Sequence, residues 1–345
     1  MKDKAASHAL AIKDKEHVFL LPAEREPSQC LVDARRDLLA TVEVEKPVGW
    51  WRAELLGASV ARARTSAAEA LAKQPGASTV AALAKVLSTE SAFWGTRAAC
   101  AKGLGALRSP DAKKALVAAL AAKHPKARRA VVAALGDFRE DGEVAKALTA
   151  LCRKGDASYF VEADAARALG RLKAPGAFEV LVSMLERTGF QDTVRCGALD
   201  GLAEIKDKRA WPHVVAAAKY GEPPFARRAA VMAIAKLAEV ADKKSEAVEL
   251  LAQYLRDPGF RVRLAAIDAA SVLGDERLVP ALSSTPFLDG REQRLAREAV
   301  RALRAKSPAK ELTALRGDLE KLKAELRALQ ERVDAKDAKR PRASR

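Results

Sequence analysis

One pattern recurs along most of the chain and constrains its fold more than any other feature. In residues 193–205, Arg195 is followed by small residues three and six positions later and by bulky apolar residues seven and ten positions later. The same frame starts, at intervals of about 30 to 36 residues, at Arg64, Arg97, Arg128, Glu162, Arg195, Arg227, Arg263 and Gln293. A helical repeat of this length predicts a solenoid, in which each short helix is stabilised by its neighbours.

The position six residues after the start of each frame never holds a large side chain. Its occupants are Ala70, Gly103, Ala134, Ala168, Gly201, Ala233, Ala269 and Ala299. Offsets 0, 3, 7 and 10 share one helical face, and offset three on that face is also small in most repeats. Small side chains allow the axes of neighbouring helices to approach to about 8 Å. We therefore predict that neighbouring helices approach closely at these small residues, while the bulky apolar residues fill the space between layers.

Each of these helices is expected to follow a first helix, for example over residues 143–153 and 245–256. Loop signals separate the helices: Ser109-Pro110 predicts a helix start, and Asp257-Pro258-Gly259 predicts a turn. The predicted fold is therefore all-α, an α-solenoid of about eight helical pairs over residues 47–304.

The runs at residues 128–136 and 162–170 identify a candidate family. They resemble the short bacterial HEAT repeat, of the kind first described in phycobilisome lyases, over residues 47–303. Tetratricopeptide aromatics and the ankyrin Thr-Pro-Leu-His are absent. The resemblance implies a scaffold that binds a protein partner, although such arrays serve many functions, lyases among them.

Residues 1–46 have a different pattern. Residues 17–21 form a short apolar run, residues 38–45 alternate in part at period two, and residues 30–33 offer a third short run. We predict the end of a β domain whose other strands are missing, which stops at Pro47. Trp50 and Trp51 follow and are expected to cover the first repeat on a helix that also carries Leu55 and Leu56.

The C-terminal residues carry a heptad pattern, predicted as one helix over residues 307–336. Its apolar seam consists of Leu312, Leu315, Leu319, Leu322, Leu326, Leu329 and Val333. Three alternatives are open: self-association through a coiled coil, folding back onto the last repeat, or a lone helix. Residues 337–345 are basic and are predicted to be a disordered tail.

The order of these parts suggests a second resemblance. A strand, Glu45-Lys46-Pro47, a tryptophan-bearing helix, the repeats and a heptad end together resemble the C-terminal region of bacterial zinc aminopeptidases of the aminopeptidase N type. In that family a small β-sandwich and a HEAT-like helical domain follow the catalytic domain. The resemblance implies that this chain is a non-catalytic auxiliary domain, encoded separately or as a fragment.

The motifs for chemistry are absent from the sequence. The aminopeptidase family needs H-E-x-x-H for zinc, whereas the histidines here, His8, His17, His124 and His213, are never four residues apart. We predict no enzyme activity, no catalytic residue, no metal ligand and no cofactor.

The net charge of +16 raises the question of an acidic partner. The last 45 residues hold 14 basic and 7 acidic residues, which contributes +7 and leaves +9 for the other 300. The candidate binding surface is an arginine column, expected on a concave face: Arg64, Arg97, Arg128, Arg195, Arg227 and Arg263. On one interpretation the column binds an acidic protein or, as the alternative function, nucleic acid; on the other it is an internal ladder.

Cysteine usage and hydropathy bear on the location of the protein. Cys30, Cys100, Cys152 and Cys196 show no C-x-x-C spacing and are predicted to be free, buried thiols. No run approaches the ~20 apolar residues that a membrane-spanning helix needs. We predict a cytoplasmic protein without a membrane partner, and an N-terminus that could equally be internal to a longer parent.

Overall fold

The computed structural model describes residues 6–23, 25–34, 37–305 and 308–337, and within the last helix it describes the side chains of residues 313 and 315–330. Residues 48–305 lie wholly in the described part and form eight helical pairs. The pairs are α1 (Val48–Gly57) with α2 (Ala61–Leu71), α3 (Ala77–Ser88) with α4 (Trp94–Leu107), α5 (Pro110–Ala118) with α6 (Pro125–Leu135), α7 (Gly142–Lys154) with α8 (Tyr159–Leu172), α9 (Ala177–Met184) with α10 (Thr193–Ile205), α11 (Trp211–Ala218) with α12 (Pro224–Leu237), α13 (Lys244–Tyr254) with α14 (Phe260–Leu273), and α15 (Val279–Ser284) with α16 (Gly290–Ala305). Short 3-10 turns lie at Ala119–Ala121, Phe190–Asp192, Lys208–Ala210 and Glu276–Leu278. The predicted α-solenoid is confirmed.

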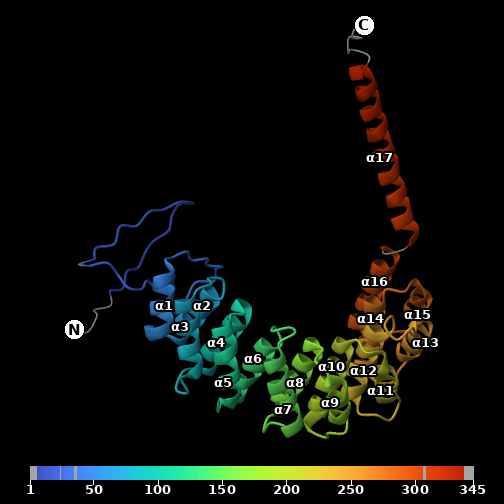
Figure 1. Ribbon diagram of the computed structural model, residues 1–345, viewed down its shortest axis with the longest axis horizontal. Coiled ribbons are helices and arrows are strands. Elements are labelled where there is room, and N and C mark those ends of the chain that lie inside the picture. The colour runs from blue at the N-terminus through green and yellow to red at the C-terminus, as the bar shows by residue number, and fades with distance from the viewer. Residues whose placement is uncertain (1–5, 24, 35–36, 306–307, 338–345) are drawn as a thin grey trace, which may run out of the picture.

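The pairs stack into an arc (Figure 1). The even-numbered helices contact one another in unbroken order from α2 to α16, whereas contacts between successive odd-numbered helices are sparser. The even-numbered helices therefore line the inner curve, and helices such as α5, α7 and α9 lie along the outer one. This arrangement creates two edges: one holds the loops from odd to even helices, and the other holds the loops from even to odd helices.

The side chains of Ser109 and Asp141 cap helix starts, and the sequence predicts the first of these two starts. Ser109 accepts a hydrogen bond from the backbone N–H of Ala112 at 3.1 Å, and Pro110 is the first helical residue. At α7, the Asp141 carboxylate accepts from the N–H groups of Glu143 and Val144. Each cap supplies acceptors for N–H groups that a helix start leaves unpaired.

The small-residue column lies at the contacts between even-numbered helices, as predicted. Seven of its eight residues are buried, and Ala70 in the first repeat is half-buried. At Gly201 an added Cβ would lie 2.5 Å from the carbonyl oxygen of Ala166, and at Gly170 it would lie 2.3 Å from the carbonyl oxygen of Gly201. The backbones of α8 and α10 therefore touch, which only glycine allows at these positions.

The N-terminal segment contradicts the sequence prediction. The described residues between 6 and 46 form no strand, so the predicted β-sandwich remnant is wrong there. Val18 and Leu20, in the first predicted strand, are 84% and 93% exposed. The physical reason is that an isolated alternating segment has no neighbouring strand to complete its hydrogen bonds and no second layer to cover its apolar face.

The segment is held to the first repeat through Glu54, a buried residue of α1. The ammonium group of Lys46 pairs with the Glu54 carboxylate and donates to the carbonyl oxygen of Cys30 at 2.8 Å. Lys46 also lies 3.9 Å from the ring centroid of Trp51. Trp51 packs against the core, as expected for a cap of the array, whereas Leu56 is exposed and does not belong to the packed face.

After the solenoid the chain continues as a single helix, α17 (Pro308–Asp337), which runs away from the arc (Figure 1). The side chains of Leu315, Leu319, Leu322, Leu326 and Leu329 are 52–65% exposed. The predicted seam residues Leu312 and Val333 lie outside the described side chains, as does the predicted tail from residue 338 onward.

Candidate functional site

The arginine column lies at the edge that holds the loops from odd to even helices. Each arginine stands near the start of an even-numbered helix and donates to carbonyl oxygens at the end of the odd-numbered helix before it. The donor–acceptor distances are 2.8 Å for Arg64 to Leu55, 2.9 Å for Arg97 to Leu87, 2.8 Å for Arg128 to Ala122, 2.8 Å for Arg195 to Leu185, 3.1 Å for Arg227 to Ala218 and 2.9 Å for Arg263 to Asp257. These carbonyls have no donor within their own helix, so the arginines cap the helix ends.

Most of these arginines also hold a carboxylate. Arg97 makes two hydrogen bonds to Glu90, at 2.7 and 2.9 Å, and Arg128 pairs in the same bidentate way with Asp156. Arg227 pairs with Asp257, and Arg263 pairs with Glu292 at 2.7 Å. The side-chain hydrogen bond from Arg97 keeps the pKa of Glu90 below its ordinary value. The geometry is that of an internal ladder, whose guanidinium donors are used within the chain.

The repeat that starts with glutamate keeps the ladder with its charges exchanged. Glu162 stands where six of the other repeats have arginine, and Arg187, after α9, donates to it at 2.6 Å. Arg187 also donates to the carbonyl oxygens of Cys152 and Arg153 at the end of α7. The two residues thus satisfy the end of α7 as the arginine does elsewhere.

Above this ladder lies a row of exposed aromatic side chains, which we call the aromatic edge. Its members stand in the loops before even-numbered helices or in the first turn of those helices: Phe93, Tyr159, Phe160, Phe190, Tyr220 and Phe260. Their exposed fractions range from 39% to 80%. Aromatic residues are only 5% of the chain, so six exposed ones on one edge mark a surface suited to contact another molecule.

Contacts between repeats make the aromatic edge nearly continuous. Trp94, next to Phe93, stacks on His124 of the following repeat with ring centroids 5.9 Å apart. The guanidinium of Arg129 lies 5.0 Å from the ring centroid of Phe160, again one repeat further. The ring of Tyr159 lies against Gly189, which adjoins Phe190.

Two arginines near this edge make no ion pair within the described part of the chain. Arg261 lies over the ring of Phe225 at 4.9 Å, and among the described residues neither Arg261 nor the exposed Arg228 has an ion-pair partner. The arginine column holds several carboxylates of this edge, those of Glu90, Asp156, Asp257 and Glu292. The edge therefore combines apolar rings with available cations.

The neighbouring inner surface has mixed charge. Arg129 donates to Asp164, Arg167 donates to both Asp164 and Asp200, and each of these three distances is 2.8 Å. This chain of ion pairs crosses α6, α8 and α10. A phosphate backbone laid along the inner curve would meet these carboxylates, which disfavours it as a ligand there.

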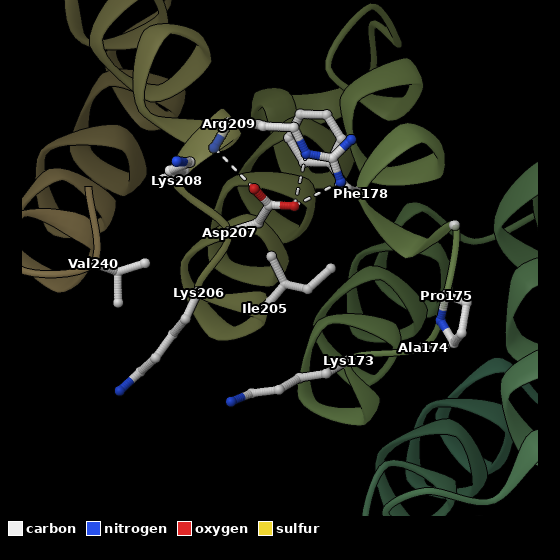
Figure 2. Close-up of a pocket in the computed structure, with 11 residues that line it drawn as sticks. Lys173, Ala174, Pro175, Phe178, Ile205, Lys206, Asp207, Lys208, Arg209 and Val240 are labelled. Carbon is white, nitrogen blue, oxygen red and sulfur yellow. Dashed lines mark hydrogen bonds and ion pairs between the residues drawn. The ribbon is translucent and has the colours of Figure 1, made fainter.

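The opposite edge holds a shallow depression of about 450 Å³ between the ends of α8, α10 and α12. Figure 2 shows Lys173 and Lys206 extending in the same direction beside it, while Asp207 faces Arg209. Asp207 accepts three hydrogen bonds from Arg209, which keeps the pKa of its carboxyl group low. The lysines adjoin helix C-termini, where cations are electrostatically favoured, so the arrangement is explained without a ligand.

The sequence missed the aromatic edge because its members stand at differing distances before each frame, from two residues for Phe160 to seven for Tyr220. Within the described residues no group of His, Cys, Asp and Glu side chains is arranged to hold a metal ion. In the same part of the chain no helix has the length and apolar character required to cross a bilayer.

Comparison with known proteins agrees with this fold. Residues 80–163 and 154–235 match the family model described as HEAT repeats. The match covers residues 80–235 of the α-solenoid, which are therefore similar to HEAT repeats. No curated protein matches the sequence.

Three similar solved structures have low sequence identity to this chain. The complex of CpcE and CpcF of phycocyanin lyase from Nostoc sp. PCC7120 shares 19% identity over 77% of this chain and 91% of that chain, with a TM-score of 0.41. Human deoxyhypusine hydroxylase shares 17% identity over 66% and 85% of the two chains, with a TM-score of 0.32. Kap121p shares 9% identity over 74% of this chain and 37% of that chain, with a TM-score of 0.49.

Proposed function

We propose that the protein is a non-catalytic scaffold that binds a protein partner along the aromatic edge. The observation that carries the proposal is the row of exposed rings on the second and on the fourth to seventh repeats, bordered by Arg228 and Arg261, which make no ion pair among the described residues. Aromatic residues and arginine supply most of the binding energy in protein interfaces. The partner's chemistry follows from the edge: an extended segment with apolar side chains for the rings and carboxylates for Arg228 and Arg261.

The arginine column has a different role in this proposal. Its guanidinium groups hold helix ends and carboxylates, so they stabilise the surface on which the partner binds. Nucleic acid is the less favoured ligand, because the arginines expected to follow its phosphates are occupied and the inner surface carries carboxylates.

The experiment selects a random peptide library against the intact protein and measures the affinity of the selected peptides. The variant is Phe160→Ser/Phe190→Ser/Tyr220→Ser, and the control is Val240→Ser/Val272→Ser, which removes exposed apolar side chains elsewhere. We expect acidic, apolar peptides whose Kd rises at least ~10-fold in the edge variant and is unchanged in the control. Equal binding to both variants would contradict the proposal, and so would tight binding of duplex DNA that weakens steeply with salt.

The aminopeptidase context is a finer proposal with less support. Of the features that suggested it, the predicted strands are absent from the described residues, while the tryptophan-bearing helix and the repeats are present. An adjacent upstream reading frame that encodes H-E-x-x-H would support it, and an unrelated intact neighbour would count against it. The cytoplasmic location stays a prediction.

A further inference from the structure

The helix α17 presents an apolar stripe that the solenoid does not cover. Leu315, Leu319, Leu322, Leu326 and Leu329 follow one another at intervals of four, three, four and three residues, and each is more than half exposed. This is the heptad spacing with which one helix packs against another of the same kind.

The outer side of α16, the last helix of the solenoid, is polar, although Leu288 in the loop before it is exposed. The outer side of α16 carries Arg297, Arg301 and Arg304, all exposed. A polar outer face is what terminal repeats need in order to end an array in water. Folding α17 back onto it would place leucines against arginines, so the stripe is better covered by another molecule.

We propose that this molecule is a second copy of the chain, and that the two α17 helices form a parallel, in-register, two-stranded coiled coil. The proposal concerns a surface separate from the aromatic edge and does not depend on the function proposed above. In heptad terms, Leu319 and Leu326 occupy a positions, and Leu315, Leu322 and Leu329 occupy d positions.

The charges beside the stripe select a parallel pair. The g positions before Leu319 and Leu326 are the acidic residues Asp318 and Glu325, and the e positions after Leu315 and Leu322 are the basic residues Arg316 and Lys323. A parallel pair sets g against e, so Asp318 of one chain faces Lys323 of the other. An antiparallel pair sets g against g and e against e, which brings like charges together.

The contacts that these groups make within one helix are weak competitors. Lys323 lies 3.0 Å from Glu320 and Asp318 lies 3.9 Å from Lys321, and all four side chains are at least 58% exposed. Exposed pairs of this kind contribute little to stability, so the groups are available to a facing helix.

The first test is the mass of the full-length protein by sedimentation over a dilution series. We expect a dimer for the wild-type protein and for Ala324→Asp, whose position lies opposite the stripe. Leu322→Asp should raise the dissociation constant ~100-fold or more, because it puts a carboxylate into the buried seam. Both substitutions leave the solenoid untouched, which its circular dichroism checks. A wild-type monomer, a trimer, or a Leu322→Asp dimer of unchanged affinity would overturn the proposal.

The second test determines the orientation. In a Cys30→Ser background, Leu329→Cys should oxidise to a disulfide-linked dimer, because equivalent d positions face each other only in a parallel, in-register pair. Lys323→Glu should weaken association ~10-fold, and Asp318→Lys combined with Lys323→Glu should restore it. A dimer that does not crosslink, or one that Lys323→Glu leaves unchanged, would show another arrangement.

Discussion

The solenoid and α17 both carry leucines at helical spacing, but they bury them differently. Leu104, Leu169 and Leu202, at offset seven of their frames, are fully buried, whereas the described leucines of α17 are mostly exposed. The burial of the leucines differs because the two regions place different residues beside them. Each frame pairs its leucine with a glycine or alanine that lets the next layer approach, and α17 has no such column. Apolar spacing thus indicates which face of a helix packs, and the small residues indicate that the next repeat covers it.

The largest expected difference between the two regions is in how much the loss of an arginine lowers the free energy of unfolding. Arg227→Ala should lower the free energy of unfolding by ~3–5 kcal/mol, because it leaves the buried Asp257 carboxylate without its partner. Arg327→Ala, at an exposed position of α17 away from the seam, should change it by less than ~0.5 kcal/mol. Urea denaturation of the full-length proteins measures both values. Equal effects would mean that the arginine column does not stabilise the solenoid.

The same substitution of glycine should have opposite signs in the two regions. Gly201→Ala places a methyl group 2.5 Å from a backbone oxygen and should cost ~1–3 kcal/mol. Around Gly317 nothing lies within 4 Å of the added carbon, so Gly317→Ala should stabilise α17 by ~0.5–1 kcal/mol through helix propensity. Urea denaturation tests the first variant, and amide hydrogen exchange of α17 tests the second. Two changes of the same sign would contradict this distinction.

The smallest expected effect concerns the reactivity of the cysteine thiols, which should differ between the solenoid and the N-terminal segment. Burial raises the pKa of the Cys100 and Cys152 thiols to about 12 and that of Cys196 to about 11. At pH 8 roughly one in a thousand of the Cys196 thiols, and fewer of the other two, is therefore ionised. Cys30 is exposed, so the prediction of a buried thiol is wrong for this residue. A thiol reagent should therefore label one cysteine rapidly in the native protein and four in denaturant. Rapid labelling of a second thiol would show that a repeat opens.

Much of the fold could be predicted from the sequence, because every repeat of a solenoid uses the same packing arrangement. One small-residue column, present in eight repeats, predicts where neighbouring helices approach closely, and an error in one repeat is corrected by the others. The N-terminal segment offers no such repetition. Residues 38–45 alternate in part as a strand would, but a strand forms only where another strand completes its hydrogen bonds, and that partner is not encoded in the local pattern.

The candidate site was less predictable. The sequence identified the arginines but could not decide whether their donors face solvent or a carboxylate. The answer depends on residues such as Asp257, which lies 30 residues beyond Arg227 and adjacent to it in space. The sequence analysis missed the aromatic edge because loop lengths vary between repeats. The rings lie on the same edge of the solenoid but at different distances in sequence from the start of each frame.

The close approach of α8 and α10 has a mechanical consequence. Where main chain rests on main chain at Gly170 and Gly201, no rotamer can adjust to change the separation of the helices. These two layers therefore behave as a stiff block near the centre of the arc. If a ligand tightens or opens the superhelix, we expect the bending to occur in layers that lack such backbone contacts, on either side of this block.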